Sequence, residues 1–133
     1  MQSYKKSLLS NQRGFTLLEM LIVISIAGVL AAVAVPRFTN AVMLANTARV
    51  QSDLQVLNSA IVLYQAEKGV YPSAVGDLKD YVMDVEHVKP PKGKCQLRDG
   101  TTIDVTDTSY SIAADGTEAT CQSKKLSDFG RKE

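Results

Sequence analysis

The chain has 133 residues, of which 45% are hydrophobic, and its 15 basic and 14 acidic side chains give a formal net charge of +1. A charge this close to zero excludes the strong positive field that non-specific nucleic-acid binding needs, and the length suits one domain. The hydrophobic residues are concentrated near the N-terminus, so the two parts of the chain are considered separately.

The first 14 residues, MQSYKKSLLSNQRG, are polar and basic and lack a hydrophobic stretch of their own. This composition predicts a leader or a cytoplasmic tail rather than a folded element. Lys5, Lys6 and Arg13 precede the apolar run, so the positive-inside rule predicts a cytoplasmic N-terminus and an exported remainder. Removing a leader that ends at Gly14 leaves 12 basic and 14 acidic residues, a net charge of −2.

Residues 15–35 form an apolar segment of 21 residues in which Glu19 is the only charge. About 20 apolar residues cross a hydrocarbon core as a helix, so this segment is predicted to insert into a membrane. A secretory signal cleaved after Ala34 is an alternative, because Ala32-Val33-Ala34 has the small-residue pattern of a signal-peptidase site. Glu19 and the length of the apolar run argue against that alternative. A plain signal anchor without an assembly role is a further alternative, but it gives Glu19 no purpose.

Beyond the apolar run, hydrophobic residues recur with helical spacing at Val50, Leu54, Leu57, Ile61 and Tyr64. This spacing places them on one face of a helix that packs on a core, since the stripe is too short for a coiled coil. The helix is expected to continue from the apolar segment, with a kink at Pro36, and to end near Lys68 where Gly69 supplies a C-cap.

The remaining half of the chain carries turn and strand signals. Tyr71 and Pro72 predict a turn, and Ser73 is expected to cap a short helix through about Val82. Pro90 and Pro91 favour an extended path. Strands are expected in the segments KCQLR, TTIDV, SYSIAA and TEATCQ, joined by turns at Asp99-Gly100 and Asp115-Gly116.

These elements predict an α+β fold in which a long N-terminal helix packs on a small antiparallel sheet, with a polar C-terminal tail that frays. The predicted organisation is a leader over residues 1–14, a membrane helix over 15–35 and an extracytoplasmic head over 36–133. The two cysteines, Cys95 and Cys121, both fall in the exported part, where an oxidising compartment favours a disulfide between the first and last strands.

The block RGFTLLEMLIVISIAGVLAAVAVP, from Arg13 to Pro36, resembles the N-terminus of type IV pilins and of the pseudopilins of type II secretion and competence systems. The resemblance rests on the basic leader ending in Gly14, then Phe15, Thr16 and Glu19, and the apolar helix after them. Residues 57–72, LNSAIVLYQAEKGVYP, also resemble the end of the long helix in this family.

The resemblance implies cleavage by a prepilin peptidase between Gly14 and Phe15 and N-methylation of Phe15. It also implies assembly into a helical filament through Phe15, Thr16 and Glu19, with Gly28 and Pro36 as weak points of the helix. A charged acid costs about 2.5 to 3.5 kcal/mol at the centre of a membrane helix and less near its end. In a filament, Glu19 is expected to meet the Phe15 ammonium of a neighbouring subunit, which gives this costly charge a purpose.

Other sites have plainer explanations. His87 stands alone without a second metal ligand at suitable spacing, so no metal or cofactor is predicted. Calcium binding by the acids of the sheet is a minority hypothesis, because turn chemistry accounts for Asp99 and Asp115. Contact with DNA phosphates through the basic residues of the loop is a minority hypothesis, and a solvated face is the main interpretation because aromatic residues do not alternate with them. These basic residues are Lys89, Lys92, Lys94 and Arg98.

The sequence therefore predicts a structural subunit and no enzyme, since no catalytic constellation can be assembled. The main interpretation is a type IV pilus subunit that is inserted in the inner membrane and then assembles into an extracytoplasmic filament. Its expected partners are copies of itself, other pilins, the prepilin peptidase, the inner-membrane assembly platform and membrane lipid. The alternatives are a pseudopilin of a secretion or competence system and, in another class, a secreted soluble binding domain.

Overall fold

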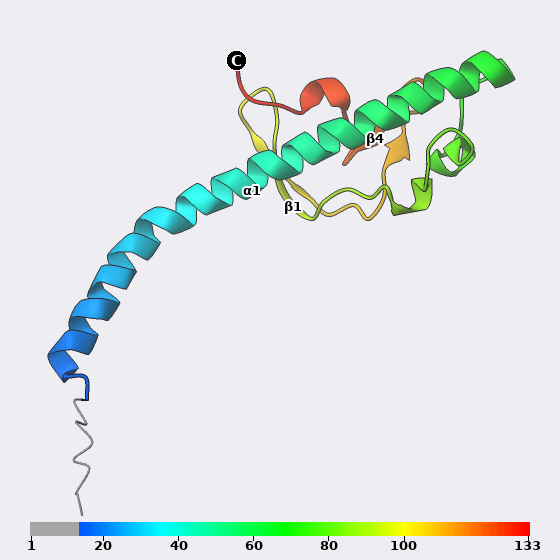
Figure 1. The fold of residues 1–133 in the computed structure, drawn as a ribbon. Coiled ribbons are helices and arrows are strands. Elements are labelled where there is room, and N and C mark those ends of the chain that lie inside the picture. Colours follow the sequence, from blue (N-terminus) through cyan, green and yellow to red (C-terminus); the bar gives the residue numbers. More distant parts are fainter. Residues whose placement is uncertain (1–13) are drawn as a thin grey trace, which may run out of the picture. The chain divides into compact units, whose positions relative to one another are not determined.

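A computed structural model describes residues 14–133, and the chain divides into two compact units, residues 1–37 and 38–133 (Figure 1). The helix α1, Leu17–Lys68, has 52 residues and contributes to both units. It continues through Gly28 and Pro36 without interruption, so neither predicted weak point ends it. The fold is the predicted α+β class, with one long helix and small antiparallel sheets.

The part of α1 in the first unit exposes all of its side chains, from Leu17 to Arg37. Among the described residues, α1 is the one helix long and apolar enough to cross a membrane. Water-exposed hydrophobic surface of this extent is unfavourable, so this part of the helix requires lipid or protein around it.

In the second unit, α1 buries the predicted face. Val50, Leu54, Leu57 and Ile61 are fully buried, and Tyr64 packs partly buried against the same core. The helix ends where the sequence predicts, because Gly69 takes a φ of +73° and its amide donates to the Gln65 carbonyl at 2.8 Å.

The segment after the helix differs from the prediction around Ser73. Two short 3-10 helices, Val75–Leu78 and Val85–His87, replace the expected helix through Val82. The Ser73 side chain accepts no capping bond. Instead its amide and hydroxyl both donate to the Asp77 carboxylate, at 3.0 and 3.2 Å, and these bonds hold the chain in a tight turn.

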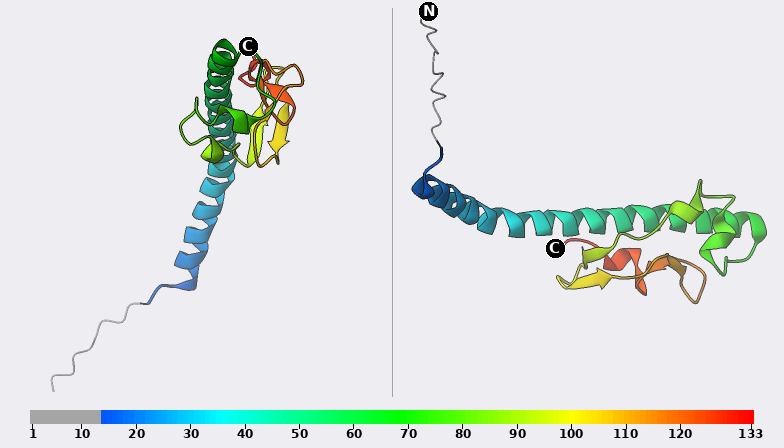
Figure 2. Two further views of the ribbon diagram at one scale, coloured as in Figure 1. Left: turned by 90° about the vertical axis from the view of Figure 1, so that its right-hand side faces the viewer. Right: turned by 90° about the horizontal axis from the view of Figure 1, so that it is seen from below.

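The strands form two sheets rather than the single sheet predicted. Strand β1 (Gly93–Gln96) pairs antiparallel with β2 (Thr102–Val105), with Cys95 opposite Ile103. A second antiparallel sheet has the order β3-β4-β5, from Ser111–Ile112, Ala119–Cys121 and Lys124–Lys125. Both sheets lie on one side of the upper half of α1 (Figure 2). The Asp-Gly turns fix each hairpin locally but do not specify which hairpins adjoin, so the sequence pattern does not predict this separation.

The prediction that the C-terminal tail frays is wrong. Phe129 is the largest fully buried side chain in the head and forms an isolated antiparallel bridge with Leu97. Its carbonyl accepts bonds from the Gln51 amide nitrogen at 2.9 Å and from Arg98 Nε at 3.2 Å. One aromatic anchor thus holds a polar segment against the helix and the first hairpin.

The predicted disulfide is not formed in the structure, in which Cys95 and Cys121 are free. They lie in different sheets, on β1 and β4, and both are fully buried. The Cys95 side chain is in a hydrogen bond with Thr47, and burial raises its pKa. Burial is also the main cause that raises the pKa of Cys121 to about 12, so both thiols act as small apolar core groups.

Candidate assembly site

The N-terminus of α1 is closed by a pair of reciprocal hydrogen bonds. The Thr16 amide donates to Glu19 Oε2 at 3.1 Å, and the Glu19 amide donates to Thr16 Oγ1 at 3.1 Å. This is a capping box, in which two amides that lack partners within the helix are satisfied. The sequence Thr-Leu-Leu-Glu carries this signature, although no capping role was predicted for Thr16 or Glu19.

The capping box gives Glu19 a partner within its own chain. An ionised carboxylate has about four acceptor positions, so the bond from Thr16 leaves Glu19 able to accept further donors. Glu19 also lies in the first turn of α1, where the positive end of the helix dipole favours a negative charge. The side chain is therefore held at the helix end and remains available to a second cation.

Gly14 and Phe15 precede the first helical residue and have no regular structure. Phe15 is 80% exposed, and a Cβ built on Gly14 meets no atom within 4 Å. The peptide bond between them, which is the predicted cleavage site, thus lies outside the helix. The remainder of the predicted leader, residues 1–13, lies outside the described residues.

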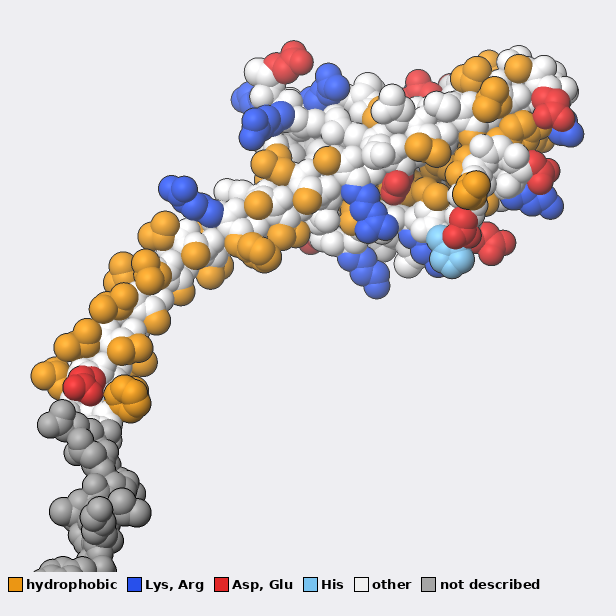
Figure 3. Space-filling view, in the orientation of Figure 1, with side chains coloured by type: hydrophobic (Ala, Val, Ile, Leu, Met, Phe, Trp, Pro, Cys, Tyr) orange, Lys and Arg blue, Asp and Glu red, His pale blue; other side chains and the backbone are white. Residues whose placement is uncertain are grey.

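The surface around this site is hydrophobic. Figure 3 shows the lower part of α1 covered by hydrophobic side chains. Glu19 is the acidic residue in the first turn of this helix. The exposed side chains next to it include Leu17, Leu18 and Met20. Phe15, Thr16 and Glu19 therefore combine an exposed aromatic side chain, a capping hydroxyl and a carboxylate at the start of an apolar helix.

The candidates in the head have structural explanations. The pKa values of Asp99 and Asp115 are lowered by hydrogen bonds from Thr101 and Thr117, which are turn contacts. His87 is exposed at the end of a 3-10 helix, with Nδ1 2.5 Å from Asp84. Within residues 14–133, no three His, Cys, Asp or Glu side chains are grouped in a way that would hold a metal ion.

Comparison with known proteins connects this geometry to a family. Residues 9–35 match the prokaryotic N-terminal methylation motif. The chain is 34% identical over 90 residues to the type II secretion system core protein G of Klebsiella michiganensis, a match that covers 68% of this chain and 62% of the relative. It is 42% identical over 71 residues to the protein of the same name from Pectobacterium carotovorum subsp. carotovorum, covering 53% of this chain and 46% of the relative.

A second group of relatives is matched over a shorter segment. The type IV major fimbrial protein FimA of Dichelobacter nodosus is 42% identical over 52 residues, which is 39% of this chain and 33% of the relative. The chain thus spans only about a third to three-fifths of the length of these relatives. No solved structure matches the chain.

A capped, acidic helix start on a long apolar helix, joined to a small α+β head, defines a class of membrane-inserting subunit with an N-terminal methylation motif. The chain belongs to the superfamily of type IV pilins and type II secretion pseudopilins. Members of this superfamily are structural proteins rather than enzymes.

Proposed function

We propose that the chain is a pseudopilin of a type II secretion system, which is the alternative to the type IV pilus subunit that the sequence first predicts. The length of the match to the type II core proteins supports this proposal. A match of 90 residues is longer than the 68 residues up to the end of α1, so it extends beyond this helix. The 52-residue match to FimA is short enough to lie within the N-terminal helix alone.

The proposed cycle begins in the inner membrane, with residues 15–35 as the membrane helix, residues 1–14 as a cytoplasmic leader and residues 36–133 as an extracytoplasmic head. Cleavage after Gly14 creates an ammonium group on Phe15, which is then methylated. The capping box holds the Glu19 carboxylate at the start of the helix, where the Phe15 ammonium of a neighbouring subunit pairs with it. Moving the uncompensated Glu19 charge out of the lipid then favours assembly.

The proposed partners are further copies of this chain, other pilins and an assembly platform in the inner membrane. A filament confined to the cell envelope follows from the secretion proposal, whereas a type IV pilus extends from the cell. The match to FimA supports a type IV pilin as the second candidate function.

Disruption of the gene in its source organism separates the two candidates. We expect proteins normally released into the medium to accumulate inside the envelope, while surface pili seen by electron microscopy stay unchanged. Restoring the intact gene should restore release, and restoring a Gly14→Asp variant should not, because its leader stays attached. Normal release combined with loss of surface pili would favour the type IV pilin.

The mass of the mature N-terminus tests the processing step independently. Assembly predicts a chain that begins at methylated Phe15. A mature chain that begins at Val35 would instead support the secreted domain released after Ala34.

A further inference from the structure

One methionine projects from the surface of the head. Met83 is 97% exposed, although Val82 and Val85 close to it in the chain are buried, at 6% and 7%. Asp84 takes a left-handed φ of 58°, and its carbonyl accepts a hydrogen bond from the His87 amide at 2.9 Å. A non-glycine residue in this region costs free energy, and such strain is found often at functional sites. The backbone thus displays Met83 at a tip between two buried valines.

The segment that carries Met83 is acidic and anchored. Residues 77–86 contain four acidic residues and one basic residue, Lys79, which gives a net charge of −3. The Tyr81 ring packs edge-on against Tyr64 with the ring centroids 5.7 Å apart, and the Tyr81 hydroxyl donates to the Glu67 carboxylate. Because the segment is already anchored, little conformational entropy is lost when a partner covers Met83. Methionine is also enriched at protein interfaces.

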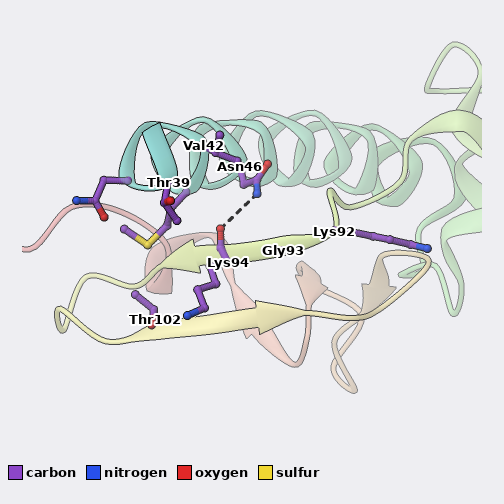
Figure 4. A pocket seen from close by; sticks show the side chains of 9 residues that line it. Thr39, Val42, Asn46, Lys92, Gly93, Lys94 and Thr102 are labelled. Carbon is purple, nitrogen blue, oxygen red and sulfur yellow. Dashed lines mark hydrogen bonds between the residues drawn. The ribbon is translucent and has the colours of Figure 1, made fainter. Parts of the chain in front are cut away.

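A cavity of about 470 Å³ lies between α1 and the first hairpin (Figure 4). Thr39 and Met43 of α1 line one wall, Lys94 and Thr102 line the hairpin wall, and the exposed surface of the lining is mostly apolar. In Figure 4, Lys94 extends toward Thr102, whereas Lys92 points away from the cavity and belongs to the surface beside it. The cavity is therefore an apolar hollow with a basic group on its hairpin wall.

The segment that forms the hairpin wall has the opposite charge to the tip. Residues 89–98 contain Lys89, Lys92, Lys94 and Arg98 and no acidic residue. Asp104 is opposite Lys94 in the hairpin, which leaves a net charge of +3 for this segment and Asp104 together. Within residues 14–133, neither Lys92 nor Lys94 is in a salt bridge. The tip and the surface beside the cavity are thus complementary in charge.

The tip and the cavity lie toward opposite ends of the head portion of α1. Tyr81, which precedes Met83 by two residues, packs on Tyr64, whereas the cavity lies beside residues 39–46. Tyr64 follows Asn46 by 18 residues, which is about 27 Å along a helix. Within the head, Figure 1 shows the same separation between the short 3-10 helices and β1. Met83 therefore cannot reach the cavity of its own chain, but it can reach that of a second copy.

We infer that Met83 of one copy of this chain inserts into the cavity of a second copy, beside Met43, with the acidic residues of its segment facing Lys94 and the basic strand. The contact joins different surfaces of the two heads, so it is heterologous and builds an open filament or a ring rather than a symmetric dimer. The inference rests on self-assembly, which is part of the proposed function. It concerns contacts between heads and is separate from the contact proposed for Glu19.

Disulfide cross-linking of the full-length chain in its source cells tests the inference. Met83→Cys is combined with Thr102→Cys on the hairpin wall and, in a second variant, with Met43→Cys on the helix wall. The native Cys95 and Cys121 are fully buried and do not compete. After mild oxidation, a non-reducing gel should show dimers, trimers and larger species, because each copy is linked to the next. Loss of this ladder from both paired variants would overturn the inference.

Two controls show whether the contact is specific. Val62→Cys combined with Thr102→Cys should give no ladder; Val62 is an exposed apolar residue of α1 close to Tyr64, and so at the same end of the head as the tip. A ladder of equal strength from this control would overturn the inference. Cross-linked dimers from Met83→Cys alone would also overturn it, because they would show a symmetric contact between two tips.

The charge complementarity is tested in the Met83→Cys and Thr102→Cys background. Lys94→Gln should slow cross-linking by up to about fivefold, as expected for loss of an exposed ion pair. Lys125→Gln makes the same change of charge in the second sheet, on β5, and should leave the rate unchanged. Equal rates for these two variants would overturn the inference.

Filament yield separates this inference from the secretion proposal. Met83→Ser should lower the yield of sheared filaments at least about tenfold, because it removes most of the apolar surface that the contact buries, whereas Met83→Leu should retain the yield. Normal filaments from Met83→Ser would overturn the inference and leave the secretion proposal intact. A cross-linked ladder in cells whose protein release does not depend on this gene would support the inference and refute the secretion proposal.

Discussion

Glu19 has two roles that different substitutions separate. Glu19→Leu removes both the charge and the acceptor for the Thr16 amide. Glu19→Gln removes the charge but keeps an oxygen that can accept that bond, since glutamine also serves in a capping box. The pair of variants therefore distinguishes a carboxylate needed for docking from an acceptor needed only to start the helix.

The expected free-energy costs of losing the two roles of Glu19 differ. Loss of a helix cap costs about 1 kcal/mol, which a long membrane helix tolerates. Loss of a charged hydrogen bond to the neighbouring ammonium costs about 1.5 to 3 kcal/mol at each contact. A loss of that size lowers the association constant roughly 10- to 150-fold, and a filament repeats the contact at every subunit.

We therefore expect both variants to be cleaved after Gly14 and inserted in the membrane, and both to lack filaments. Cleavage is measured by mass spectrometry, insertion by membrane fractionation and assembly by the yield of sheared filaments. Methylation of Phe15 is scored separately, because the enzyme can also contact Glu19. Normal filament yield from Glu19→Gln would refute the docking argument and leave capping as the role of this residue.

Three further predictions concern the head. Gly116→Ala should destabilise the head by about 2 kcal/mol or more in denaturant melts, because Gly116 has a φ of +75° and a Cβ would lie 2.6 Å from Tyr71 Cβ. The control Gly76→Ala should be nearly neutral, because a Cβ at Gly76 meets open space. Ser123→Gly should raise stability by about 0.5 kcal/mol, because Ser123 has a φ of +61° that glycine adopts without strain, and a lower melting temperature would contradict this. Stability should fall as pH rises from about 9 toward 12, because the pKa of Cys121 is raised in the folded state to about 12 and the unfolded thiol ionises first. The pKa values of Cys95 and Tyr81 are also raised, so Cys121→Ala should reduce this slope without abolishing it, and an unchanged slope would show that the other groups are responsible.

Local patterns in the sequence were enough to predict the helix and its end. The spacing of Val50, Leu54, Leu57 and Ile61 has the period of a helix, and Gly69 is the residue type that accepts a left-handed C-cap. The hairpin between Gly93 and Val105 followed from the Asp99-Gly100 turn in the same way. The capping box of Thr16 and Glu19 was equally local and was missed because Glu19 was considered only as a charge in lipid.

The sequence by itself thus determined the leader pattern, the apolar helix with its single acid and the buried face of its upper half, since each depends on residues close together in the chain. Only the tertiary structure decided that the strands separate into two sheets, that Cys95 and Cys121 lie in different sheets, and that Phe129 fixes the C-terminus. These features depend on which distant side chains fill the space beneath α1. No local period or turn signal specifies that choice, because it is made by packing among segments far apart in the chain.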